Sequence, residues 1–196
     1  MSRNALLVTS AALAAWGLHA TYLTQQLRQS RLDPLTGLCR RDEFARRARR
    51  VLEQNPDAAV LLLDLDEFKH INDTLGHQVC DVLLAVTANR LRAALPGAVL
   101  GRLGGDEFVA ASPCRARELY ALEAALTRPV LHQHGVTTPG VSIGLSAGPH
   151  QSLSQALRAA DAAMYEVKAA GGGLARFDPN KHRAAHGRAL ALTGSR

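Results

Sequence analysis

The chain has 196 residues, of which 47% are hydrophobic and 20% are charged. This length and composition predict one compact domain with a short appendage, and they exclude a disordered or collagen-like chain. Aromatic residues make up only 4%, which disfavours the stacking surfaces of single-stranded nucleic-acid binders. The three cysteines are too few and too widely spaced for a disulfide framework or a CxxC zinc site, so we expect a reducing compartment.

Basic residues are concentrated in two segments of the chain. The formal net charge is +6, and residues 28–50 and 176–196 each carry an excess of Lys and Arg. Such clusters are typical of nucleic-acid binding, of contact with an anionic membrane surface or of a solvated helix face. Because neither a DNA-binding motif nor interleaved aromatic residues accompany them, we expect no nucleic-acid partner.

The N-terminal segment has the pattern of a membrane anchor. Residues 5–23 contain no Lys, Arg, Asp or Glu, and as a helix they would be roughly 28 Å long, close to the thickness of a bilayer core. A cleaved signal peptide and an ordinary buried helix are the alternatives. The arginines that follow, beginning with Arg28 and Arg31, outnumber Arg3 on the other side. The positive-inside rule therefore predicts a single-pass protein of the inner (cytoplasmic) membrane with the rest of the chain in the cytoplasm.

We expect three regions along the chain. Residues 1–32 would form the anchor helix and a polar stalk, and residues 33–178 would form the folded domain. Residues 179–196 show no apolar face and are expected to be disordered.

Within the central region, apolar periodicity predicts alternating helices and strands. Asp33, followed by Pro34, is placed to cap a helix. A continuous apolar run predicts a buried strand, and two later strands flank Gly104-Gly105 as a tight hairpin. The predicted helices are 41–54, 73–95, 115–127 and 153–170, and the predicted strands are 58–65, 98–103, 107–111, 141–146 and 174–177. This order favours an α/β (α+β) fold with a mixed central sheet and flanking helices.

Acidic residues follow the buried strand and the hairpin turn. Asp64 and Asp66 lie two apart at the end of an apolar strand, so their side chains share one face. Asp106 and Glu107 come directly after the two glycines. Hard oxygen ligands of this kind suit Mg²⁺ or Mn²⁺, and nucleotidyl transferases use a pair of such ions to activate a hydroxyl against phosphorus. Each acid taken alone is more often a solvated loop residue.

Polar residues that could hold a nucleotide come next in the chain. Lys69 could neutralise phosphate charge, while Asn72, His77 and Asp81 supply hydrogen-bond donors and acceptors. The alternative is that they are a helix cap, a surface residue and a helix-face charge.

Five segments resemble the motifs of one family. Residues 102–108 (RLGGDEF) resemble the signature of the diguanylate cyclase (GGDEF) family. The other four resemble that family's further motifs in order and spacing, and the resemblance covers roughly residues 31–178. These segments are 33–38 (DPLTGL), 64–77 (DLDEFKHINDTLGH), 141–144 (VSIG) and 160–168 (ADAAMYEVK).

The resemblance implies a palm-like nucleotidyl cyclase fold and a reaction. Two subunits, forming a homodimer, would each hold one GTP, and the two molecules would condense to cyclic di-GMP with release of two pyrophosphates. Two Mg²⁺ or Mn²⁺ ions in each active site would be held by Asp64, the Leu65 carbonyl and Asp106, with Glu107 supporting them or helping to deprotonate the 3′-hydroxyl. The substrate would be bound by Asn72 and Asp81 at the guanine edge, by His77, Gly104 and Gly105 nearby, and by Lys69 and Lys168 at the phosphates, with Lys69 also counted as catalytic.

The sequence also departs from the family pattern. Cys80 stands where a Gly usually precedes the guanine-reading Asp, and Arg40 stands where the opening motif usually has Asn. Gly172 replaces a phosphate-contacting Arg, which should weaken GTP binding. The inhibitory product site would require Arg and Asp at Leu95 and Ala98, so product inhibition through it is not expected. A catalytically weak GTP-binding or scaffolding module is therefore the alternative to an active cyclase.

Overall fold

The computed structural model describes residues 31–113, 121–150 and 152–179, together with Trp16, Leu119 and Lys181. Nearly all of the predicted anchor, stalk and tail lies outside these residues. Trp16 is helical and 76% exposed. Within the part that is described, no helix combines the length and the apolar character needed to cross a bilayer.

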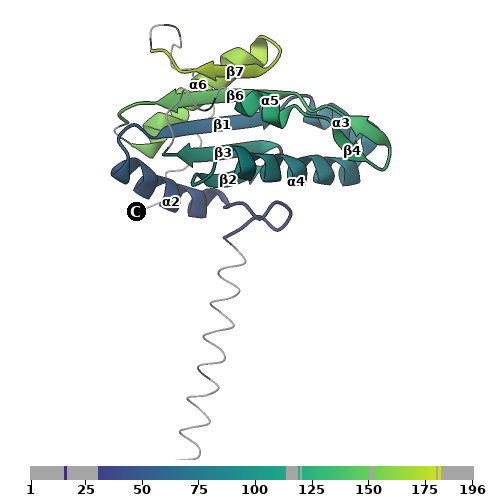
Figure 1. Ribbon diagram of the computed structural model, residues 1–196, viewed down its shortest axis with the longest axis horizontal. Helices are drawn as coiled ribbons and strands as arrows, with labels where there is room; N and C mark the ends of the chain where they lie inside the picture. The colour runs from purple at the N-terminus through teal and green to yellow at the C-terminus, as the bar shows by residue number, and fades with distance from the viewer. Residues whose placement is uncertain are drawn as a thin grey trace, which may run out of the picture.

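A five-stranded mixed sheet forms the centre of the domain, in the order β2-β3-β1-β6-β7 (Figure 1). The central strand β1 pairs antiparallel with β3 and β6, and β7 pairs parallel with β6 at the edge. The strands are β1 (Ala59–Leu65), β2 (Val99–Gly104), β3 (Glu107–Ser112), β6 (Val141–Ala147) and β7 (Gly173–Arg176). The prediction of a mixed sheet with flanking helices is confirmed.

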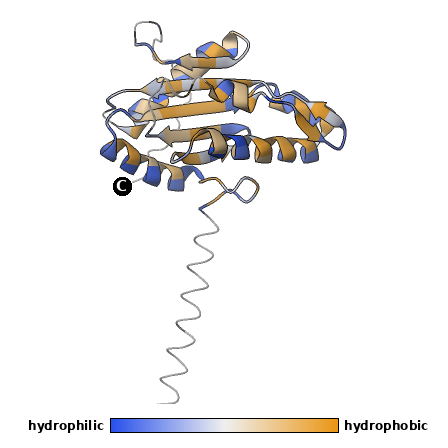
Figure 2. Ribbon diagram, viewed as in Figure 1, coloured by the Kyte–Doolittle hydropathy of each residue, from blue (hydrophilic) through white to orange (hydrophobic). Residues whose placement is uncertain are grey.

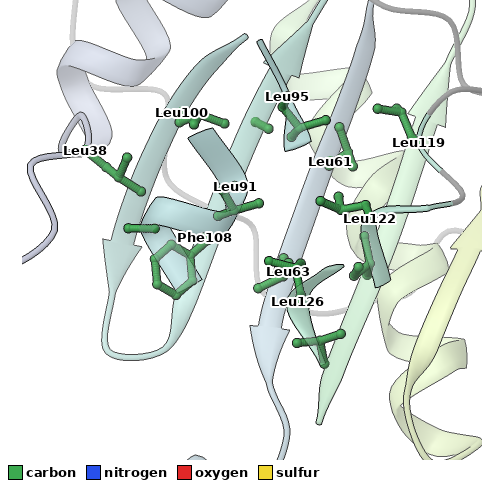
Figure 3. Packing of buried hydrophobic residues seen from close by; sticks show 14 of the residues in the cluster. Leu38, Leu61, Leu63, Leu91, Leu95, Leu100, Phe108, Leu119, Leu122 and Leu126 are labelled. Atoms are coloured by element: carbon green, nitrogen blue, oxygen red, sulfur yellow. The ribbon is translucent and has the colours of Figure 1, made fainter. Parts of the chain in front are cut away.

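Strand β1 is buried along its whole length because helices cover both faces of the sheet. On one face, Val60 and Leu62 pack with α2 (Arg41–Gln54) and α6 (Leu153–Ala169). On the other, Leu61 and Leu63 pack with α4 and α5, as Figure 3 shows for part of this cluster. The two helices are α4 (His77–Ala94) and α5 (Leu122–Leu126).

Helix α2 forms as its pattern predicts, with its apolar side on the sheet. Phe44 and Ala48 are fully buried, whereas Arg49 and Arg50 are exposed. Figure 2 shows this division, with hydrophobic colour along the strands and hydrophilic colour on α2. The arginine-rich face of α2 is therefore in solvent.

Two predictions were wrong in detail, and a third is tested only in part. The single helix predicted over 73–95 is two helices, α3 (Phe68–Leu75) and α4, because Gly76 adopts φ +81° and ends one as the other begins. Asp33 does not cap a helix; its carboxylate accepts hydrogen bonds from Thr36 N and Oγ1 and closes a turn. Of the helix predicted over 115–127, the structure describes α5, while residues 115–118 and 120 lie outside the described residues.

A small hairpin was missed altogether. Strands β4 (Val130–His132) and β5 (Gly135–Thr137) pair antiparallel as a separate two-stranded sheet. Leu131 and Val136 face each other across it and are 79% and 62% exposed. Strands of three residues with exposed apolar side chains do not show the alternating pattern from which strands are predicted.

Candidate active site

Two strand ends bring the predicted acids together. Asp64, near the end of β1, lies in register with Glu107, the first residue of β3. The hairpin between β2 and β3 turns through Gly104 and Gly105, whose φ angles of +151° and +50° favour glycine. Asp106 therefore sits at the hairpin tip, beside the end of the central strand.

The charges at this point interact strongly. Asp64 is buried, and its Oδ1 accepts a hydrogen bond of 2.6 Å from Lys168 Nζ at the end of α6. Burial, and then repulsion from Asp64, raise the pKa of Asp106 above its usual range. Lys168 and Arg102 offset part of that effect. Two carboxylates and one ammonium group thus share one site.

This donor set fits a divalent cation. Burial and then the charge of Asp64 raise the pKa of Asp106, and an added positive charge would stabilise its ionised form against both effects. Mg²⁺ is usually held by one or two carboxylates, with waters and substrate phosphates completing its shell. No three His, Cys, Asp or Glu side chains gather as a metal cluster among the residues described. The fit is therefore to a pair, Asp64 and Asp106.

The predicted guanine-binding residues lie at the corner between α3 and α4. The Oδ1 atom of Asn72 is buried and has no hydrogen-bond partner. His77 and Asp81 are exposed, four residues apart on α4. Burial raises the pKa of the Cys80 thiol, and the charges of Asp81 and Asp106 raise it further. Cys80, on the first turn of α4, is thus close enough to both Asp81 and Asp106 for their charges to act on its thiol.

Lys69 is placed less decisively. It is exposed on the first turn of α3, three residues before Asn72 on the same helix. No hydrogen bond or ion pair within the described residues joins it to the acids. Its assignment to phosphate binding and catalysis stays a prediction.

Sequence reasoning missed a contact that fixes Asp66. The Ser142 hydroxyl on β6 donates to Asp66 Oδ1 at 2.6 Å, and the Asp66 amide donates to the Gly140 carbonyl at 3.0 Å. A Cβ atom at Gly172 would lie 2.6 Å from Asp66 Oδ2, and one at Gly140 would lie 2.9 Å from it. Asp66 is thus enclosed between two glycines. Nothing in the sequence marks Ser142 as its partner.

A second network holds the hairpin from behind. Arg102 donates to the Gly105 carbonyl from Nε at 2.9 Å and from Nη2 at 2.7 Å. Its Nη1 reaches Asp33 Oδ1 at 3.2 Å. Burial opposes ionisation of Asp33, but hydrogen bonds from Thr36 and the charge of Arg102 hold its pKa below the usual range. The turn at Asp33 therefore supports the hairpin that carries Asp106.

The sequence of this chain is similar to those of known proteins. The sequence model described as diguanylate cyclase, GGDEF domain, matches residues 30–173. A 19.3 kDa protein of Streptomyces ambofaciens is 44% identical over 161 residues, which cover 80% of this chain and 88% of that protein. The probable diguanylate cyclase DgcC of Escherichia coli K12 is 32% identical over 176 residues. The match covers 78% of this chain but 45% of DgcC, so the chain spans less than half the length of that relative.

Solved structures show the same fold. The coiled coil and GGDEF domain of DgcB from Caulobacter crescentus, in complex with c-di-GMP, is 26% identical with a TM-score of 0.76, covering 90% of this chain and all of that one. The GGDEF domain of TpbB (YfiN) from Pseudomonas aeruginosa is 31% identical with a TM-score of 0.70, covering 76% of this chain and 95% of that one. From its sequence match and its fold, the chain belongs to the diguanylate cyclase GGDEF domain family, a family of nucleotidyltransferases.

Proposed function

We propose that this protein is an active diguanylate cyclase, which condenses two GTP molecules into cyclic di-GMP and two pyrophosphates. The observation that carries the proposal is the meeting of Asp64, Asp106 and Lys168 at the end of β1. Carboxylates that hold cations, beside an ammonium group, suit the handling of a triphosphate.

The described side chains support separate roles for the acids and the base-reading residues. Asp64 and Asp106 would hold Mg²⁺ or Mn²⁺, and the bound metal would neutralise charge on the phosphates. Glu107, in register with Asp64, would support this pair or accept the proton of the 3′-hydroxyl. The unpartnered Asn72 Oδ1 is an acceptor for a guanine N–H group, and Asp81 on α4 offers a second acceptor.

Lysines would contact the phosphates. Lys168 Nζ is within 2.6 Å of Asp64 Oδ1 while its side chain is 48% exposed, so it can reach an incoming anion. In the protein without nucleotide, the same ammonium partly offsets the charge of the two acids. If the Lys168 ammonium exchanged its contact with Asp64 for one with a phosphate, it would remain paired with a negative charge.

Assembly follows from the chemistry. In each half-reaction a 3′-oxygen forms a bond to the α-phosphorus of the other GTP, the bond from that phosphorus to pyrophosphate breaks, and the hydroxyl proton passes to a base. Because each subunit would hold one GTP, two sites must face each other for both bonds to form. We therefore propose a homodimer, in which holding the reacting atoms about 3 to 3.5 Å apart supplies much of the rate enhancement.

One observation favours a weaker alternative. Gly172 lies against Asp66 with φ +101°, so the backbone here does not accommodate the arginine that the family pattern has at this position. A protein without that cation would bind GTP less tightly. The alternative is a module that binds GTP or a partner with little turnover.

Location is a separate proposal. Residues 5–23, which contain no charged side chain, would anchor the protein in the cytoplasmic membrane with the catalytic domain in the cytoplasm. Restricting the chains to one membrane would raise their local concentration and favour the dimer.

To test the function, the protein fragment 25–196 is incubated with GTP and Mg²⁺ at protein concentrations from nanomolar to micromolar. The products are resolved by mass spectrometry. We expect cyclic di-GMP, with specific activity that rises with protein concentration, and fusion to a parallel coiled coil should remove that dependence. Constant specific activity from a protein that light scattering shows to be monomeric would contradict the dimer. Binding of GTP without turnover would support the alternative.

A further inference from the structure

An open groove lies behind the hairpin, on the side of α2. Its volume is about 810 Å³, within the range of small-molecule sites. Gly104 and Gly105 of the hairpin form one wall, and the start of α2 forms another. The charged residues that line it are Arg31, Asp33, Arg40, Arg41, Asp42, Glu43, Arg46 and Arg102.

The acidic residues of the groove are largely paired already. Glu43 is buried and pairs with Arg46 at 2.6 Å and with Arg47 at 2.5 Å, and these hydrogen bonds outweigh burial and lower its pKa to about 2. Asp33 pairs with Arg102. Asp42 is the one acidic lining residue without an ion pair among those described.

Three arginines are left over. Arg31 and Arg40 are exposed, and neither guanidinium has a carboxylate partner within the described residues. Arg41 makes one long contact, 3.5 Å from Nη2 to the Leu103 carbonyl. Guanidinium groups bind phosphate through paired N–H donors, so this excess selects anions.

The N-terminus of α2 adds to the positive charge of the groove. Arg40 is the N-cap of α2 and its side chain makes no capping hydrogen bond. The positive end of a 14-residue helix therefore lies at the groove wall, where it stabilises a phosphate.

The groove is connected to the candidate active site. Arg41 reaches the Leu103 carbonyl, and Arg102 donates twice to the Gly105 carbonyl, directly before Asp106. A phosphate that takes over either guanidinium would release a hairpin carbonyl. Occupancy of the groove would thus be coupled to the position of Asp106 through these two arginines.

We propose that this groove binds a ligand that carries two or more phosphate groups, and that its occupancy shifts the hairpin. The proposal that the groove binds phosphate groups depends only on the groove itself. The proposed effect of the groove on the hairpin rests on the proposed cyclase activity.

The binding test uses the full chain in EDTA with inorganic tripolyphosphate, followed by calorimetry. Without a divalent metal, the acids of the candidate active site repel the probe. We expect Arg31→Gln with Arg40→Gln to weaken binding at least about tenfold, since each removes a charge-assisted contact. The matched control is Arg49→Gln with Arg50→Gln, which removes the same charge from the exposed face of α2.

A second control separates the groove from the nucleotide site. Lys69→Ala with Lys168→Ala should leave tripolyphosphate affinity within about twofold. Loss of affinity in the lysine variant but not in the Arg31 and Arg40 variant would overturn the proposal, as would equal losses in both arginine pairs. Unfolding midpoints are measured for all variants, so that loss of binding is not confused with loss of fold.

The source of the phosphate is distinguished with vesicles. Phosphatidylglycerol vesicles that displace tripolyphosphate from the wild-type groove, when phosphatidylcholine vesicles do not, would indicate a lipid headgroup. Failure of both kinds of vesicle to displace tripolyphosphate would indicate a soluble phosphate compound.

The proposed effect of the groove on the hairpin is tested by GTP turnover at fixed free Mg²⁺. We expect a change on adding tripolyphosphate that is absent from the Arg31 and Arg40 variant; an identical change in both would refute the coupling and leave the binding result intact.

Discussion

Gly172 and Gly171 offer a matched pair of substitutions next to the candidate active site. Their φ angles, +101° and +100°, are nearly the same. A Cβ at Gly171 would meet nothing within 4 Å, whereas one at Gly172 would lie 2.6 Å from Asp66 Oδ2. Alanine at the two positions therefore introduces the same backbone strain, but only at Gly172 does it also introduce steric conflict, chiefly with Asp66.

The difference in stability can be worked out from these contacts. The strained backbone costs each variant about 1–3 kcal/mol. Asp66 cannot move away easily, because Gly140 encloses its other side and Ser142 holds its Oδ1. Displacing it breaks a hydrogen bond to a charged group, which contributes about 1.5–3 kcal/mol. Gly172→Ala should therefore be less stable than Gly171→Ala by that second amount.

The assay is urea unfolding of both variants, alone and combined with Asp66→Ala. In the Asp66→Ala background, the difference between the two alanine substitutions should shrink, because only the 3.3 Å approach of the Gly172 Cβ to the Val141 carbonyl oxygen remains. Equal destabilisation in the wild-type background would refute the assignment of Asp66 as the obstacle. So would a difference of undiminished size in the Asp66→Ala background.

Three further predictions concern charge and pH. In EDTA, Asp106→Asn should raise the urea midpoint of unfolding at pH 7. Burial and Asp64 raise the pKa of Asp106, so the wild type loses stability as the pH rises through that pKa, whereas the amide does not titrate. An unchanged midpoint at pH 7 would contradict this. Arg102→Gln should lower stability by about 1–3 kcal/mol by removing the ties to Gly105 and Asp33, as a denaturant titration would measure. Burial lowers the pKa of His150 from its usual 6.5, so wild type should lose stability as pH falls below 6.5. His150→Phe should flatten that dependence between pH 7 and 5, and parallel curves would exclude the role of His150.

Much of the fold could be predicted because the apolar pattern of several segments follows directly from which of their faces are buried. Helix α2 has one apolar face and one arginine face, and its predicted bounds match the structure. Strand β1 is continuously apolar because helices cover both faces of the sheet. The break at Gly76 was missed because the apolar periodicity of α4 is strong and a single glycine before it does not interrupt the pattern. The β4–β5 hairpin was missed because its strands have three residues each and pack little apolar surface.

The site could be predicted only in part. Asp64 and Asp106 converge for a local reason, since one lies near the end of a strand and the other sits at a hairpin tip. Contacts across long separations carry no such local signal. Lys168 and Asp64 are 104 residues apart, and Ser142 and Asp66 are 76 apart, so only the folded sheet and α6 reveal them. The arginine groove was visible in sequence as a cluster of charge, but the pairing of Glu43 and Asp33 that leaves three arginines unneutralised was not.

The central claim is that the carboxylates of β1 and the hairpin carry metal-dependent condensation of GTP. The most direct measurement incubates the full chain with GTP and Mg²⁺ and quantifies cyclic di-GMP for wild type, Asp106→Asn and the control Asp57→Asn. Asp57 is an exposed acid before the start of β1, at the opposite end of that strand from Asp64. We predict product from wild type and from the control, and a loss of at least about 100-fold in Asp106→Asn. Turnover of Asp106→Asn within about threefold of wild type, with the same Mg²⁺ dependence, would contradict the assignment of the metal-binding acids.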